Sequence, residues 1–198
     1  MNASLENIWN IWVSGGWVMI PLLALAGMLY YIAIQLLVYT YREGPQGRNA
    51  DQWENWVQDP SNAHGASGEI IVYTQTGVSS SAQIRGRFEE VEEALVGEVD
   101  QRLTMVKTLV GAAPLLGLLG TVIGMLLTFE GISKGAGSET AAQVAHGISQ
   151  ALITTQTGLM IALPGIFMVL VIRRRLKLWE SHLARLEGLT LTKFNFSS

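Results

Sequence analysis

Three long stretches of the chain carry no charged side chain. The first lies between Glu6 and Arg42, with its apolar run at about 16–39, the second covers 108–129 and the third covers 147–172. About 20 helical residues cross a hydrocarbon core of about 30 Å. An isolated span must be helical, because each unpaired backbone group in lipid costs several kcal/mol. The pattern therefore predicts an all-α integral membrane protein with three transmembrane helices.

The first stretch is predicted to be a retained span and not a cleaved signal peptide. A signal peptide begins with a basic segment, whereas residues 1–15 contain Glu6 and neither Lys nor Arg. Aromatic residues are expected at both membrane interfaces. They are Trp9, Trp12 and Trp17 at one end of the span and Tyr39 and Tyr41 at the other.

Basic residues predict the orientation of the spans. Six of them (Arg42, Arg48, Arg85, Arg87, Arg102 and Lys107) lie between the first and second spans, and six more (Arg173, Arg174, Arg175, Lys177, Arg185 and Lys193) follow the third. Only Lys134 lies elsewhere, in the short loop after the second span. Because cytoplasmic segments carry the excess of Lys and Arg, we expect a periplasmic N-terminus and a cytoplasmic C-terminus.

The predicted organisation has four parts. Residues 1–41 form the periplasmic N-terminus and the first span, 42–106 a cytoplasmic segment, 107–172 the second and third spans, and 173–198 a cytoplasmic C-terminal helix. Within 42–106, turn-forming residues surround a short helix at about 51–58, with Trp53, Trp56 and Val57 on one face. From Ser81 apolar residues recur every three or four positions (Phe88, Val91, Leu95, Val99, Leu103 and Val106). This spacing predicts one long helix that rises from the cytoplasm and continues into the membrane. Another amphipathic helix is expected at 176–191.

Composition supports the membrane assignment and narrows the function. Hydrophobic residues make up 49% of the chain and charged residues 15%, against about 25% charged in soluble domains. The net charge of -3 gives no indication of nucleic-acid binding. There is no cysteine, and the three histidines lie far apart in sequence, so we expect no cofactor, no metal site and no enzymatic activity.

None of the three predicted spans contains Asp, Glu, Lys, Arg or His. Ionisable residues inside a membrane usually mark ion pathways, so this chain alone cannot build a relay of titrating carboxylates. Small and hydroxyl residues form stripes instead. They are Gly117, Thr121, Gly124 and Thr128 in the second span, and Ala151, Thr155, Gly158 and Ala162 in the third.

The small-residue stripes favour close packing between helices, since Gly and Ala let backbones approach. A lone threonine hydroxyl also bonds readily to a carbonyl of its own helix. A third stripe, of Gln150, Thr154 and Thr157, would meet lipid unfavourably. This face is expected to turn toward protein or toward a wet pore.

Two motifs resemble the ExbB/TolQ/MotA proton-channel family, and within it the ExbB proteins most. Residues 111–125 (GAAPLLGLLGTVIGM) resemble its second span, and residues 147–159 (GISQALITTQTGL) with Ala162, Leu163 and Pro164 resemble its third. The match covers about 81–177, and residues 42–80 show no clear counterpart. The resemblance assigns Thr121 and Thr155 to the pore. The polar stripe leaves Thr154 and Thr157 as polar pore candidates beside them. Helix packing is the role expected of Pro114, Gly117, Gly120, Gly124, Gly158 and Pro164.

What the family does is expected here only through that resemblance. It implies a homopentameric ring in the cell inner membrane around ExbD- or TolR-like subunits, whose single membrane helix supplies an aspartate. Proton flow would drive the ring, and force would reach a TonB-like protein that energises outer-membrane transport. A motor of the Tol-Pal type and a non-conducting membrane scaffold remain alternatives. Gln150 stands where ExbB and TolQ commonly have a glutamate, so a proton-binding group should come from another chain.

Overall fold

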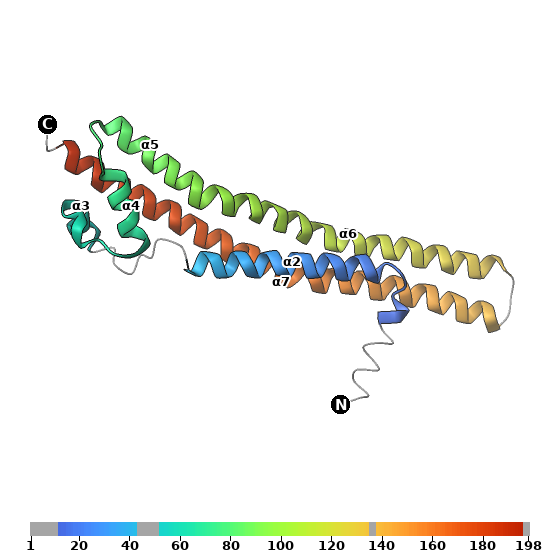
Figure 1. The fold of residues 1–198 in the computed structure, drawn as a ribbon. Helices are drawn as coiled ribbons and strands as arrows, with labels where there is room; N and C mark the ends of the chain where they lie inside the picture. The colour runs from blue at the N-terminus through green and yellow to red at the C-terminus, as the bar shows by residue number, and fades with distance from the viewer. Residues whose placement is uncertain (1–11, 43–51, 135–137, 196–198) are drawn as a thin grey trace, which may run out of the picture. The chain divides into compact units, whose positions relative to one another are not determined.

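The structure is a computed structural model that describes residues 12–42, 52–134 and 138–195. Every element in these ranges is helical (Figure 1). The elements are α2 (Met19–Arg42), α3 (Trp53–Gln58), η2 (Pro60–Asn62), α4 (Gly65–Gln75), α5 (Ser81–Glu92), η3 (Glu93–Gly97), α6 (Glu98–Ser133) and α7 (Ser138–Asn195). The prediction of an all-α protein is confirmed. Trp9 and residue 51, with which the predicted short helix begins, lie outside the described residues.

Three helices are long and apolar enough to cross a membrane: Met19–Arg42, Ser81–Ser133 and Glu139–Phe194. The second and third contain the charge-free stretches 108–129 and 147–172, and the first contains the predicted apolar run from Met19 on, since residues 15–18 form a turn before it. Three candidate spans are therefore confirmed. Pro21 is accepted near the start of α2 because the first turn of a helix needs no backbone donors. The predicted helix at 176–191 is the continuation of α7, which runs unbroken for 58 residues.

The helix predicted from Ser81 is present and is one residue out of step in its middle. Residues Ser81–Ser133 are helical for 53 residues, and Glu93–Gly97 within them form a π-helical turn. A π-turn adds one residue to an α-helix, and within this turn Val96 is the buried residue. On either side of it Phe88, Val99, Leu103 and Val106 of the predicted stripe are buried. Val91 and Leu95 of that stripe are only half-buried.

The chain divides into two compact units. The first unit comprises Met1–Ala33 and Met105–Val169, and the second comprises Ile34–Thr104 and Leu170–Ser198. In the first unit Val18, just before α2, forms a core with Met19 and Leu22 of that helix. Side chains from α6 and α7 pack against it: Leu116, Ile123, Ile153 and Ile161. Segments of three helices thus make one bundle, with exposed apolar residues such as Leu126 and Phe167 on its outside.

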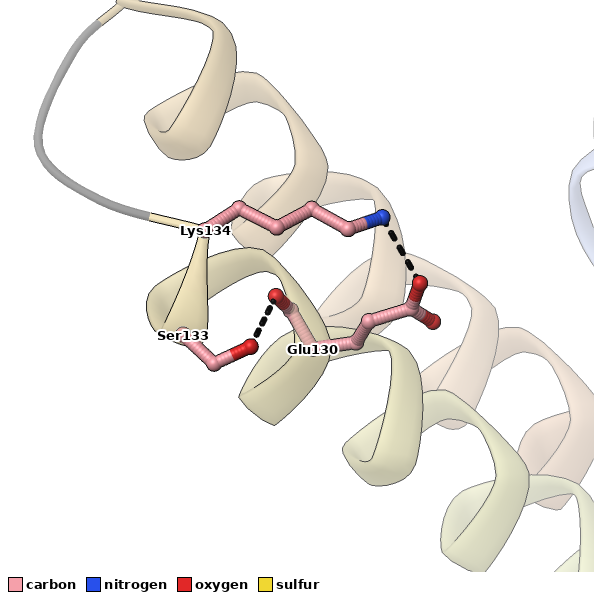
Figure 2. A network of polar contacts seen from close by, with 3 residues as sticks. All are labelled: Glu130, Ser133 and Lys134. Carbon is pink, nitrogen blue, oxygen red and sulfur yellow. Dashed lines mark hydrogen bonds and ion pairs between the residues drawn. The ribbon is translucent and has the colours of Figure 1, made fainter.

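Lys134, the basic residue predicted in the loop after the second span, lies one residue past the end of α6. Its Nζ lies 2.7 Å from Oε1 of Glu130 (Figure 2). The hydrogen bond and the charge of Lys134 lower the pKa of Glu130 below its ordinary value. Ser133 Oγ donates to the Glu130 carbonyl at 2.8 Å, which satisfies one backbone acceptor at this helix end. The lone cation of this loop is therefore paired with a carboxylate.

In the second unit the short helix α3 buries its two tryptophan side chains. The predicted face of α3 is confirmed, since Trp53, Trp56 and Val57 are all buried. The Trp53 ring meets the His182 ring edge-on at 5.2 Å between centroids. Lys193 of α7 donates to the Val57 carbonyl at 2.8 Å and to Gln75 Oε1 at 3.0 Å. A cation thus caps the end of α3, where helix carbonyls lack partners.

Candidate ion-path site in the membrane helices

Helices α6 and α7 meet backbone to backbone within the first unit. A Cβ added at Gly124 would lie 2.6 Å from the Gly147 carbonyl oxygen, and one at Gly158 would lie 2.7 Å from the Ala113 carbonyl oxygen. A Cβ at Gly117 would lie 3.0 Å from the Thr154 carbonyl oxygen. We call this contact between α6 and α7 the seam. Glycine fits at these positions of the seam because it has no Cβ, which allows the close approach of membrane helices. The packing expected of Gly117, Gly124 and Gly158 agrees with this geometry.

Gly120 packs differently, against a side chain. A Cβ there would meet the hydroxyl of Thr154 and would lie 2.7 Å from its Cγ2 methyl. Gly165, which the sequence motifs did not single out, is buried where three helices meet: an added Cβ would lie 2.7 Å from Val110 Cγ2 and 3.3 Å from Leu29 Cδ2. The seam thus extends along the bundle and includes α2.

Thr155 is half-buried, and its hydroxyl faces two carbonyls. Oγ1 lies 3.3 Å from the Gly117 oxygen of α6 and 3.3 Å from the Ala151 oxygen of its own helix. A hydroxyl has one proton to donate and two lone pairs to offer. With its proton directed at these carbonyls, the Thr155 oxygen acts as an acceptor toward any third group.

Thr121 shows the same polarity on α6. It is half-buried, and its Oγ1 donates to the Leu118 carbonyl at 2.7 Å. Its oxygen is therefore also an acceptor toward a further group. Neither threonine is itself an acid or a base near neutral pH, so both can hold and orient a proton-bearing group but cannot store the proton.

The stripe of Gln150, Thr154 and Thr157 turns largely toward protein. Gln150 is 4% exposed and Thr154 is fully buried, while Thr157 is half-buried. The Thr154 hydroxyl donates to the carbonyls of Gln150 (3.1 Å) and Ala151 (3.0 Å), and Thr157 donates to the Ile153 carbonyl at 2.8 Å. Gln150 and Thr154 lie inside the first unit, beside its own helices.

Both prolines of the motifs lie inside continuous helices, Pro114 in α6 and Pro164 in α7. Proline has no N–H to donate, so each one leaves a carbonyl of the preceding turn without its usual partner. Near Pro164 another donor reaches a carbonyl, since Tyr30 Oη of α2 donates to the Ile161 oxygen at 2.9 Å. Tyr30 ties the first span to the third. Sequence reasoning did not single out Tyr30, and the signal available for it is a phenol hydroxyl within an apolar run.

Within the described parts of the chain, no group of three or more His, Asp or Glu side chains gathers around a common point. The second and third spans consist of apolar, small and hydroxyl residues. The polar atoms available there are hydroxyls, one buried carboxamide and backbone carbonyls.

These features define a class of protein: an all-helical, multi-pass membrane protein whose second and third candidate spans pack through glycines and carry hydroxyls beside the seam. The profile of the MotA/TolQ/ExbB proton channel family matches residues 68–184, more than half of the chain. The chain belongs to this family. Membership assigns it to a family of proton channels of the inner membrane, in keeping with its three candidate spans.

Relatives match part of the chain. A protein named ExbB-like 1 from Synechocystis sp. is 49% identical over 71 residues, which are 35% of this chain and 27% of the relative. The biopolymer transport protein ExbB of Aquifex aeolicus is 38% identical over 88 residues, 42% of this chain and 59% of the relative. The Tol-Pal system protein TolQ of Haemophilus influenzae is 35% identical over 88 residues, which are 43% of this chain and 38% of the relative. The chain thus spans less than two thirds of each of these relatives.

Proposed function

We propose that this chain is the ring subunit of a motor of the ExbB–ExbD type, driven by the proton-motive force in the inner membrane. The observation that carries the proposal is the pair of half-buried threonines, Thr121 and Thr155, in spans that contain no acid or base. Both hydroxyls donate to carbonyls and offer their oxygens as acceptors. Such oxygens suit a neutral, protonated carboxyl, which needs an acceptor for its O–H.

The proton-binding carboxyl then belongs to a partner. An ExbD- or TolR-like subunit with one membrane helix would bring an aspartate next to Thr121 and Thr155, inside a homopentameric ring of this chain. The aspartate would be neutral while it crosses the low-dielectric part of the path, because a buried carboxylate is strongly disfavoured. Each protonation would change what the two threonines contact, which couples proton flow to motion of the ring.

Orientation in this proposal follows the basic residues. The segments that carry Arg85, Arg87 and Arg102, and the run 173–175, lie in the cytoplasm, and the N-terminus lies in the periplasm. Lys134 is the one basic residue of the sequence on the opposite side, so the bias in Lys and Arg still favours this orientation. The output is energisation of TonB-dependent outer-membrane transport through a TonB-like protein. The relatives include both an ExbB and a TolQ, so Tol-Pal-type work on the envelope is the alternative output.

A non-conducting scaffold is the second candidate function. The observation that favours it is Gln150, which stands where ExbB and TolQ commonly carry a glutamate and which is buried. A scaffold should keep working when the proton gradient is collapsed with an uncoupler, whereas a motor should stop. For a motor, the chain by itself should conduct no protons in liposomes, and co-reconstitution with an ExbD-like subunit should produce proton conductance.

The test of the two threonines uses valine substitutions. Thr155→Val and Thr121→Val remove the hydroxyl and roughly keep the shape, so rings should assemble with the partner while proton-driven transport is lost. Thr192→Val is the matched control, because this exposed hydroxyl of α7 also bonds a carbonyl of its own helix, at 2.8 Å from the Gly188 oxygen. Normal transport in both membrane variants would mean that the hydroxyls only pack, and the motor proposal would lose its main support.

A further inference from the structure

The chain makes a tight turn before its first span. The Gly15 N–H donates to the Trp12 carbonyl at 3.3 Å, and the Gly16 N–H donates to the Val13 carbonyl at 3.2 Å. Gly16 has a φ of +71°, a conformation that an L-residue with a Cβ adopts only at a cost. The turn leads directly into Val18 and Met19, which begin the core of the first unit.

The side chain of Gln150 fills the space beside this turn. A Cβ built on Gly16 would meet the Gln150 carboxamide, closest to Nε2, 2.9 Å from Cδ and 3.4 Å from Oε1. Next to it, a Cβ on Gly15 would lie 3.3 Å from Cγ2 of Ile153, one turn further along α7. Two glycines therefore bring the backbone of the entry turn onto the α7 face that carries Gln150. The two contacting positions lie 134 residues apart in the sequence.

The environment of this contact suits an amide and disfavours a carboxylate. Gln150 is 4% exposed, and Met19, whose side chain lies against Gly15 of the same turn, is 3% exposed. Burial of an ionised carboxyl without a partner charge is costly and shifts its pKa upward. A carboxamide has nearly the shape of a carboxylic acid, provides donors and acceptors, and stays neutral at every pH.

We infer that Gln150 is a positioning residue that fastens the turn at Gly15 and Gly16 to α7, and thereby sets where the first span starts against the third. The inference deepens the proposed function, because it assigns the replaced acidic position a role inside the subunit and takes it off the proton path. Thr121 and Thr155 remain the residues of the proton path. The Gln150 amide positions the helices of the first unit that carry these two threonines.

A double-mutant cycle tests the contact. Gly16→Ala is expected to destabilise the subunit through the strained φ and through the collision with Gln150. In a Gln150→Ala background the collision disappears and only the strain remains. The two substitutions should therefore couple by about 2- to 150-fold in the ratio of folded to unfolded protein, as contacting residues do. The ratio is measured by SDS titration in mixed micelles, followed by tryptophan fluorescence.

Controls keep the cycle interpretable. Gly27→Ala lies in α2, the helix that follows the turn, at a position where an added Cβ meets nothing within 4 Å, so it should not couple to Gln150→Ala. If Gln150→Ala does not fold, Gln150→Ser relieves the same collision and retains a hydroxyl. Additive effects of Gly16→Ala with either Gln150 variant would overturn the inference.

A pH profile separates positioning from proton transfer. Gln150→Glu is expected to fold at acidic pH, where the carboxyl is neutral, and to lose stability as pH rises above the ordinary carboxyl pKa, because burial raises the pKa of the folded form. The pH profile of transport per assembled ring should match that of the unchanged chain wherever the variant folds. A shifted transport profile with unaltered stability would place the position on the proton path and overturn the inference. The unfolding measurement needs neither the partner subunit nor a proton gradient. If the two substitutions couple and the ring nevertheless works without a proton gradient, the proposed motor is wrong while the positioning role of Gln150 stands.

Discussion

Because Gly124 and Gly147 touch across the α6–α7 seam, we expect that adding a side chain at Gly124 destabilises the protein. Gly124→Ala would place its Cβ 2.6 Å from the Gly147 oxygen and 2.8 Å from the Ala151 nitrogen. Both neighbours are backbone atoms of a helix, so no side-chain rotation can make room. Since nonbonded carbons settle at about 3.5–4.0 Å from their neighbours, the two helices have to part by about 1 Å.

The cost follows from three terms. Overpacking of a close contact costs about 1–3 kcal/mol, and parting the helices breaks the hydrogen bond from Thr155 to the Gly117 carbonyl, which for a membrane helix pair contributes about 0.6 kcal/mol. Replacing Gly by Ala inside a helix returns about 0.8–1 kcal/mol. The net loss in the free energy of unfolding is about 0.6–2.8 kcal/mol, and transport should fall with it because Thr155 moves.

Gly111→Ala is the matched control on the same helix. An added Cβ at Gly111 meets nothing within 4 Å, so this variant gains the helix term and has no clash. The helix term is common to both variants and cancels in their difference. That difference should be about 1.6–3.6 kcal/mol, the sum of the overpacking and hydrogen-bond losses. SDS titration of both purified variants measures it. Equal unfolding midpoints for Gly124→Ala and Gly111→Ala would refute the reasoning that the two backbones touch.

Two further predictions concern charged groups outside the spans. Lys193→Met removes the cation that reaches the Val57 carbonyl and should destabilise the second unit by about 1.5–3 kcal/mol, the usual worth of a charged hydrogen bond; limited proteolysis around α3 reports this, and Lys177→Met on the exposed face of the same helix should leave cleavage unchanged. Lys134 lowers the pKa of Glu130. Their contact therefore stabilises the end of α6 fully at pH values above the ordinary carboxyl pKa, and this stabilisation is lost as the pH falls through the lowered pKa of Glu130. An NMR titration of Glu130 should show its midpoint move up in Lys134→Met, and an unmoved midpoint would contradict the pairing.

The sequence predicted the architecture because its signals are local. A charge-free stretch of spanning length must be helical in lipid wherever its neighbours are, so the three long helices followed without knowledge of their packing. The face of α3 with Trp53, Trp56 and Val57 also followed, because its polar side is exposed to water and makes the period of burial visible. Thr121 and Thr155 were found through family motifs, and their pore role stays a prediction.

Tertiary structure decided which faces of those helices meet. A membrane span is apolar toward lipid and toward its neighbours alike, so its periodicity does not show which side is packed. The sequence therefore left open whether Gln150 and Thr154 turn to protein or to a pore, and contacts between helices bury both. The π-turn at 93–97 is likewise invisible in a three-or-four spacing, and within it Val96 is buried while Leu95 is only half-buried. The meeting of Gly16 with Gln150 depends on how two distant segments are rotated and slid against each other, which no local pattern encodes.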